Sequence, residues 1–256
     1  MSFIRDISSP NSRIFCVGDI HGCISELSLL LSYLKNDLSF NEDDLLIFIG
    51  DYIDRGPGSR EVLDLLIALK SENANVIFLR GNHELMLEGW IDNTPDGDFY
   101  IVNGGRETLK SYGLSVDSSP EDFIEQFPEQ HLQFIRELDW GVVVGGIVCV
   151  HAGLNPNKSL VDQSPLDIVW IREEFIQPTH KLNKTVIFGH TPFKEVMFDL
   201  PYKIGIDTGL VYGNLLSCIE LTRGEVISIR RGEKQFSHQV FPAGWKGVNP
   251  NSKGVM

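Results

Sequence analysis

Three apolar segments, each ending in an acidic or amide residue beside a glycine, recur at intervals of about one strand–helix–strand unit. Asp51 follows Asp19 by 32 positions (51 − 19), and Asn82 follows Asp51 by 31 (82 − 51). Between these residues the apolar positions are spaced as on the inner face of a helix, for example over residues 62–69. Near-continuous apolar strands that alternate with such helices predict a parallel sheet covered by helices.

The carboxyl ends of parallel strands meet at one edge of a sheet, so we expect the three side chains to gather there. In the second half, apolar runs over residues 142–150 and 215–229 contain turn signals and predict β-hairpins. These patterns predict an α/β protein of two packed sheets with helices outside, as a single domain over residues 1–243. Residues 90–138 are predicted to form a helical excursion over the site, and residues 244–256 a frayed tail.

Composition narrows the class of partner. The chain has 256 residues and a formal net charge of −13, which argues against nucleic acid or an anionic membrane as partner. The amino terminus lacks the apolar core of a signal peptide, and no apolar run is long enough to span a bilayer. The cysteines form no Cys-x-x-Cys pair and are predicted to be free thiols, so we expect a cytoplasmic protein.

The residues that follow the apolar runs are the oxygen and nitrogen donors that divalent cations prefer. Asp19 and His21 stand one residue apart and can face the same ion at the end of a strand. Asp51 follows the middle of the first three strands, where it can bridge two ions about 3.5–4 Å apart. We therefore predict a dinuclear centre at the carboxyl ends of the strands, with the ligands Asp19, His21, Asp51, Asn82, His151 and His190.

Four other residues suggest what chemistry the ions would assist. His83 adjoins Asn82 and is predicted to be a general acid that protonates the leaving oxygen, with Asp54 orienting its imidazole. Arg55 and Arg172 are predicted to bind phosphate, because a guanidinium offers a planar fork to two oxygens. Together these groups predict the transfer of a phosphoryl group to water.

The motifs also resemble those of a known family, the calcineurin-like metallophosphoesterases. More narrowly, the chain is similar to the bacterial and phage branch of the phosphoprotein phosphatases, over about residues 13–221. The motifs that carry the resemblance are Gly18-Asp19-Ile20-His21-Gly22, Gly50-Asp51-Tyr52-Ile53-Asp54-Arg55-Gly56, Gly81-Asn82-His83-Glu84, His151-Ala152-Gly153 and Gly189-His190-Thr191-Pro192. Tyr212 falls one position late for the active-site tyrosine of the eukaryotic members, so it is not assigned that role.

The resemblance implies a four-layer αββα sandwich and the same residue roles. It also implies two divalent cations, most often Mn²⁺, with iron or zinc as alternatives. The implied activity is that of a serine/threonine protein phosphatase, which hydrolyses phosphomonoesters of proteins by in-line attack of a hydroxide that bridges the two ions. The substrate would be a phosphorylated protein or a small phosphoester.

Three alternatives stand beside this interpretation. The related symmetrical diadenosine tetraphosphate hydrolases share the metal motifs and resemble the chain in Arg55-Gly56-Pro57-Gly58-Ser59. As a family they lack the acidic residue that is Asp54 here, so the Asp54–His83 pair favours a phosphomonoester. A non-catalytic scaffold predicts gaps in the ligand set, and the sequence has none. A nuclease is disfavoured by the net charge.

Overall fold

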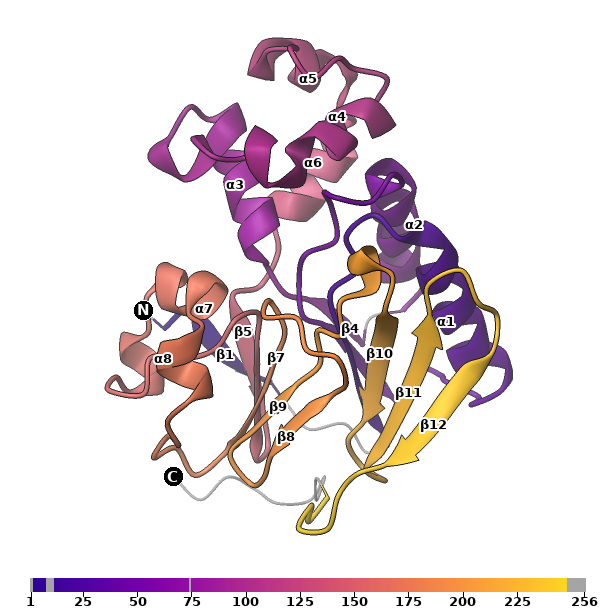
Figure 1. Ribbon diagram of the computed structural model, residues 1–256, viewed down its shortest axis with the longest axis vertical. Coiled ribbons are helices and arrows are strands. Elements are labelled where there is room, and N and C mark those ends of the chain that lie inside the picture. Colours follow the sequence, from indigo (N-terminus) through magenta and orange to yellow (C-terminus); the bar gives the residue numbers. More distant parts are fainter. Residues whose placement is uncertain (1, 8–11, 74, 248–256) are drawn as a thin grey trace.

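The computed structural model describes residues 2–7, 12–73 and 75–247. Two six-stranded sheets pack against each other, and helices cover the outer face of each (Figure 1). The predicted four-layer αββα sandwich of two mixed sheets is therefore confirmed.

The first sheet has the strand order β12-β11-β10-β2-β3-β4. Its parallel part consists of β2 (Ile14–Val17), β3 (Leu45–Phe48) and β4 (Val76–Phe78). Its antiparallel part consists of β10 (Leu215–Glu220), β11 (Glu225–Arg230) and β12 (Phe236–Val240). Helices α1 (Ile24–Asn36) and α2 (Ser59–Glu72) connect the parallel strands and cover the outer face.

The second sheet has the order β1-β5-β6-β7-β9-β8. Its strands are β1 (Ile4–Ile7), β5 (Gly141–Val144), β6 (Ile147–Val150), β7 (Thr185–Phe188), β8 (Met197–Asp199) and β9 (Lys203–Gly205). The predicted hairpin at the double glycine is the antiparallel pair β5–β6. The short helices α7 (Pro165–Trp170) and α8 (Glu173–Ile176) cover its outer face.

Alternation along the strands explains why both faces of the first sheet are apolar. Phe15 and Val17 of β2 face α1 and α2, whereas Ile14 and Cys16 face the second sheet. Successive side chains of a strand point to opposite faces, so a sheet buried on both sides needs a continuous apolar run. Between the sheets, Cys16 Sγ lies 3.7 Å from Cys149 Sγ, and all four cysteines are buried free thiols.

Residues 90–138 contain helical segments above the carboxyl ends of the strands (Figure 1). The segments from α3 onwards are α3 (Asn82–Ile91), short turns at Pro95–Gly97 and Ile101–Gly105, α4 (Arg106–Ser111), α5 (Pro120–Gln126) and α6 (Glu129–Arg136). Helix α5 begins at a capping box between Ser119 and Asp122, with Pro120 at its first position.

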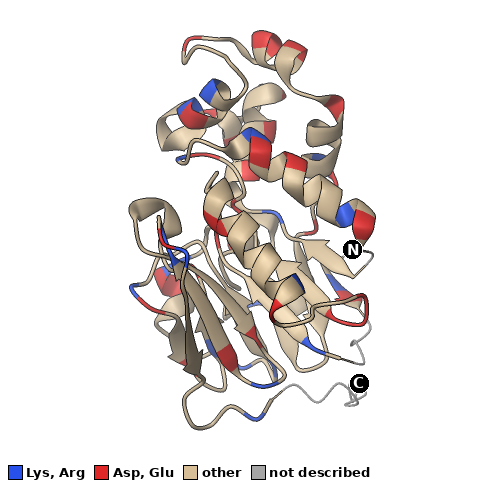
Figure 2. Cartoon of the chain, turned by 90° about the vertical axis from the view of Figure 1, so that its right-hand side faces the viewer, with Lys and Arg blue, Asp and Glu red and all other residues tan. Residues whose placement is uncertain are grey.

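The exterior matches the acidic composition. Figure 2 shows Asp and Glu spread over the helices and loops of one side of the molecule, without a continuous stripe of Lys and Arg. Across the described ranges, no helix combines the length and the apolar character that a bilayer crossing requires. Most of the predicted tail, residues 248–256, lies outside the described residues.

Candidate metal centre

The predicted metal ligands come from five strand ends in both sheets. In the first sheet, Asp19 and His21 follow β2, Asp51 follows β3, and Asn82 begins the helix after β4. In the second sheet, His151 follows β6 and His190 follows β7. All six side chains are buried. The sandwich therefore brings residues from both halves of the chain to one place at the top of the sheets.

Asp51 lies between two groups of imidazoles. Its Oδ2 atom is 3.4 Å from His21 Nε2, and its Oδ1 atom is 3.4 Å from His151 Nε2. Two buried sets of donor atoms, each within 4.8 Å of one another, share this carboxylate: His21, Asp51 and His83 in one, and Asp51, His151 and His190 in the other. A carboxylate common to two sets has the arrangement expected of a bridging ligand.

Asn82 lies between His151 and His190, and Asp19 contacts the backbone of His190. Asn82 Oδ1 is 3.0 Å from His151 Nε2 and 2.8 Å from His190 Nδ1. Asp19 accepts the backbone N–H of His190, with its Oδ2 atom 3.1 Å away. Burial, followed by the charges of Asp207 and Asp51, raises the pKa of Asp19 well above its usual range. A nearby cation would oppose this effect by favouring the ionised carboxylate.

The imidazoles are oriented by backbone carbonyls. His21 Nδ1 lies 2.9 Å from the Ile53 carbonyl oxygen, and His151 Nδ1 lies 2.8 Å from that of Ile49. When Nδ1 donates to a carbonyl, the lone pair of Nε2 faces the centre, as in metal-binding histidines. Burial lowers the pKa of His21 to about 3 and also lowers the pKa of His151 and His190, so these rings are neutral at pH 7.

The backbone at the centre is strained. His21, Asp51 and His190 have φ angles of 47°, 54° and 64°, in the left-handed region that non-glycine residues seldom adopt. Asp54 and Arg55 follow with 71° and 65°. Such conformations cost on the order of 1–3 kcal/mol each and persist only where surrounding contacts fix them.

Glu84 supplies some of the contacts that fix these backbone conformations. This role was not predicted from the sequence. Its carboxylate is fully buried in the first turn of α3. It accepts the backbone N–H groups of Asp51 at 3.0 Å, Tyr52 at 2.8 Å and Gly81 at 2.9 Å. Glu84 therefore joins the loop after β3 to the loop after β4. The sequence signal that could have indicated this role is the place of Glu84 in the Gly-Asn-His-Glu motif.

His83 and Asp54 form a buried pair beside the shared carboxylate. His83 Nδ1 lies 2.6 Å from Asp54 Oδ2, and both side chains are inaccessible to solvent. Asp54 Oδ1 accepts the hydroxyls of Thr108 at 2.6 Å and Tyr100 at 3.0 Å. Burial favours neutral His83, but the Asp51 charge and the Asp54 hydrogen bond outweigh it and raise the pKa.

The two predicted phosphate-binding arginines flank the centre. Arg55 Nη1 lies 2.7 Å from His21 Nε2, and the Arg55 backbone N–H donates to the Gly104 carbonyl. Gly104 has φ of 123°, and a Cβ there would lie 2.7 Å from Arg55 Cγ, so glycine is required for this contact. Arg172 lies just before α8, and its charge lowers the pKa of His151 and His190. Within residues 2–7, 12–73 and 75–247, neither guanidinium forms a salt bridge.

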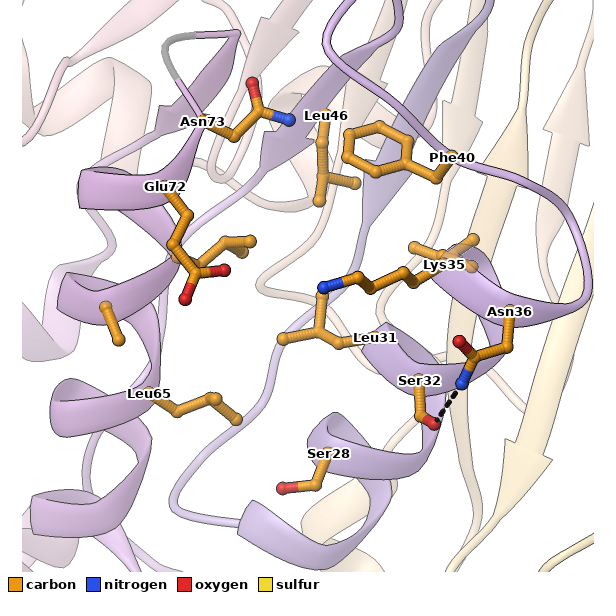
Figure 3. A pocket seen from close by; sticks show the side chains of 13 residues that line it. Ser28, Leu31, Ser32, Lys35, Asn36, Phe40, Leu46, Leu65, Glu72 and Asn73 are labelled. Carbon is orange, nitrogen blue, oxygen red and sulfur yellow. Dashed lines mark hydrogen bonds between the residues drawn. The ribbon is translucent and has the colours of Figure 1, made fainter.

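The donor set matches a pair of divalent cations. His83 Nε2 and His190 Nε2 are buried and have no hydrogen-bond partner among the described residues. Carboxylate, amide and imidazole donors suit Mn²⁺, Fe²⁺ and Zn²⁺. A separate hollow of about 400 Å³ lies between α1 and α2. Figure 3 shows Leu31, Phe40 and Leu65 among the side chains that line it. None of the predicted metal ligands lines this hollow.

The chain is similar in sequence or in fold to several proteins named as phosphatases or as hydrolases of dinucleoside tetraphosphates. The asymmetrical bis(5'-nucleosyl)-tetraphosphatase PrpE of Anoxybacillus flavithermus is 26% identical over 83% of this chain and 92% of that protein. The protein of the same name from Bacillus subtilis is 25% identical over the same shares. Among solved structures, a protein provisionally named a diadenosine tetraphosphatase has a TM-score of 0.68 at 22% identity, covering 90% of this chain and 99% of that one. A cold-active protein tyrosine phosphatase has a TM-score of 0.63 at 16% identity, covering 93% and 80%. At these identities the structural likenesses show the fold alone.

The prediction of a serine/threonine protein phosphatase is therefore wrong, because the sequence relatives carry the name of a dinucleoside tetraphosphatase. The prediction relied on the Asp54–His83 pair, which is present. However, an imidazole that donates a proton to a leaving oxygen does so whether that oxygen belongs to an alcohol or to a phosphate. Such a pair is compatible with proton transfer to either kind of leaving group and does not select between them.

The family itself is shown by a match to residues 12–213, which include every predicted ligand. The described fold, with its strand-end donors in two packed sheets, agrees with that match. The chain belongs to the calcineurin-like phosphoesterases.

Proposed function

We propose that this protein hydrolyses dinucleoside polyphosphates, with diadenosine tetraphosphate as the model substrate. The observation that carries the proposal is the match over 83% of the chain to proteins named asymmetrical bis(5'-nucleosyl)-tetraphosphatase. A symmetrical hydrolase is the alternative that the metal motifs also allow, but these relatives are named for asymmetrical cleavage. Asymmetrical cleavage of a tetraphosphate breaks a P–O–P bond nearer one nucleoside and gives a nucleoside triphosphate and a nucleoside monophosphate.

We propose Mn²⁺ as the activating ion, with iron or zinc as alternatives. His21, Asp51 and Asp19 would hold one ion, and Asp51, Asn82, His151 and His190 the other. When bound, such a pair polarises phosphoryl oxygens and lowers the pKa of water towards ~7. The shared position of Asp51 between two donor sets supports this assignment. Both rings that face Asp51 are neutral, and backbone carbonyls hold them with Nε2 towards the centre. At His21, a bound ion would replace the Arg55 guanidinium that lies 2.7 Å from Nε2.

His83 is the proposed general acid. Its Nδ1 atom is held by Asp54, and its Nε2 atom, which has no hydrogen-bond partner within the described part of the chain, is the one that can donate a proton. When water attacks phosphorus, the P–O bond to the leaving phosphate breaks, and that oxygen takes the proton from Nε2. Asp54 keeps the ring in the tautomer and orientation that this step requires.

Arg55 and Arg172 are the proposed contacts to the polyphosphate. A dinucleoside tetraphosphate carries several negative charges, which a protein of net charge −13 would repel without local cations. Neither guanidinium has a carboxylate partner among the described residues, and that of Arg55 contacts the neutral His21 ring and the Tyr212 ring. Both positive charges are therefore uncompensated by a carboxylate and suited to phosphate oxygens.

Identification of the products tests the proposal. Purified protein would be stripped of metal, reloaded with Mn²⁺ and incubated with diadenosine tetraphosphate, and the products separated by anion-exchange chromatography. We expect equal amounts of ATP and AMP, and no turnover before metal is restored. Two molecules of ADP would contradict asymmetrical cleavage, and an unchanged substrate would contradict the proposed function.

A further inference from the structure

Tyr212 presents an exposed ring at one edge of the candidate centre. It ends the short turn Leu210–Tyr212 and is 65% exposed. Gly209 and Gly213, with φ of 70° and 90°, bracket the turn and fix where the ring stands. The ring lies over the Arg55 guanidinium, with the Arg55 Cζ atom 5.8 Å from its centroid. A large, accessible aromatic surface therefore adjoins a proposed phosphate-binding residue.

Trp170 presents a second exposed ring on the other flank. It is the last residue of α7, whose start is fixed by a capping box between Ser164 and Asp167. The indole is 37% exposed and meets the His190 ring edge to face, with the centroids 5.8 Å apart. Its position is thus tied to the donor set of the second sheet.

The two rings terminate one continuous row of contacts across the centre. Tyr212 contacts Arg55, and Arg55 Nη1 is 2.7 Å from His21. Asp51 then lies 3.4 Å from both His21 and His151. The His151 and His190 rings have centroids 5.2 Å apart, and His190 contacts Trp170. In Figure 1, α7 and the turn before β10 stand on opposite sides of the upper strand ends.

A substrate that matches this row has a planar group at each end of a phosphate chain. We propose that Tyr212 and Trp170 are stacking surfaces for the two bases of a dinucleoside polyphosphate, one on each side of the metal centre. The inference rests on the proposed function and adds the residues that distinguish a dinucleotide from a simple phosphoester. Every base has a π-face, so stacking of this kind tolerates different bases while still requiring an aromatic ring.

The test compares two substrates in the metal-loaded full chain. For each variant, kcat/KM is measured for diadenosine tetraphosphate and for p-nitrophenyl phosphate, and the ratio of the two is the readout. Tyr212→Ala and Trp170→Ala are each expected to lower the ratio about tenfold, as loss of one stacking contact predicts. Tyr212→Phe and Trp170→Phe keep a π-face and should retain the ratio. Tyr212→Leu and Trp170→Leu keep apolar bulk only and should lower it.

Phe3→Ala is the matched control, because Phe3 is an exposed aromatic residue that precedes β1, the edge strand of the second sheet, and packs on Trp140. It should leave the ratio unchanged. An unchanged ratio in the Tyr212 and Trp170 alanine variants of an enzyme that hydrolyses the dinucleotide overturns the stacking proposal alone. Equal losses on both substrates also overturn it, since they mean that the rings only position Arg55 and His190. A wild-type protein that hydrolyses p-nitrophenyl phosphate but not the dinucleotide overturns the proposed function, and the stacking proposal with it.

Discussion

His83 Nδ1 lies 2.6 Å from Asp54 Oδ2, and both side chains are inaccessible to solvent. The pair joins the first turn of α3 to the loop after β3, and Thr108 and Tyr100 hold the far oxygen of the carboxylate. Four elements therefore converge to fix one imidazole, whose second nitrogen has no partner among the described residues. A side chain that transfers a proton needs a fixed orientation of this kind.

The first prediction separates proton transfer from metal binding. His83→Asn should reduce kcat about 10²–10⁴-fold, because it removes the proposed acid. The number of bound metal ions should stay nearly unchanged, because His83 is not among the proposed ligands. Turnover and elemental analysis of the same sample check both statements. Loss of both ions in this variant would mean that His83 serves as a ligand.

The second prediction concerns the shared carboxylate. Asp51→Asn should lower the metal content from two ions per chain and abolish turnover, because Asp51 belongs to both donor sets. Elemental analysis after dialysis against Mn²⁺ is the measurement. Asp43→Asn, at an exposed position in the loop before β3, is the control and should retain both ions. Full metal content in Asp51→Asn would exclude a bridging role.

The third prediction tests Glu84 as a positioning residue. Glu84→Gln replaces an oxygen that accepts backbone N–H groups with an amide group that cannot accept them, which should loosen the loops of Asp51 and Gly81. Substitutions behind metal ligands typically cost about 10–100-fold in metal affinity. Titration with Mn²⁺, followed by activity and by calorimetry, measures the loss. Glu61→Gln, on the exposed face of α2, should bind as wild type does. Equal affinities for the two variants would refute the role.

The fourth prediction concerns pH-dependent stability away from the centre. Burial favours protonated Asp44, but hydrogen bonds from Arg13, Ser12 and Asn41 outweigh it and lower the pKa of this carboxyl. Its Oδ2 atom lies 2.6 Å from Arg13 Nη2, with the Asp44 side chain fully buried. Because the pKa is lower in the folded protein, the stabilisation is fully present above the unfolded pKa of ~3.9 and is lost as pH falls through the folded value.

Asp44→Asn should therefore reduce the free energy of unfolding by roughly 3 kcal/mol at pH 7, since it leaves Arg13 without its partner. Urea unfolding at several pH values measures this difference, which should shrink as the pH approaches 3. Asp43→Asn, one residue earlier and exposed, should cost almost nothing. If the difference in free energy of unfolding between wild type and Asp44→Asn grew as the pH fell, the pKa of Asp44 would not be lowered by folding.

Much of the framework could be predicted because it follows from local periodicity. The runs that became β2, β3 and β4 are apolar on both faces, and their 31- and 32-residue spacing required parallel strands with Asp19, Asp51 and Asn82 at one edge. The strands β1, β8 and β12 carry no continuous apolar pattern of their own. They depend on partners distant in the sequence, as β1 does on β5.

Side-chain surroundings were harder to predict than strands. His131 and His180 have mostly polar neighbours in the sequence, which is typical of surface residues, yet both are buried. His131 is held between Tyr112 and Asp64, which are far from it in the chain. Phe99 is 67% exposed, whereas Tyr100 beside it is fully buried. For His131 and Phe99 the outcome is set by how the helices of residues 90–138 pack, and for His180 by its contact with the Tyr202 carbonyl. Local composition does not encode such packing.

The most direct test of the account compares substrates under identical conditions. Metal-stripped protein with Mn²⁺ restored would be assayed on diadenosine tetraphosphate, p-nitrophenyl phosphate and a phosphoserine peptide, and kcat/KM determined for each. The proposed function predicts that kcat/KM is higher for the dinucleotide by orders of magnitude, with ATP and AMP as its products. A higher kcat/KM for the phosphopeptide would contradict it.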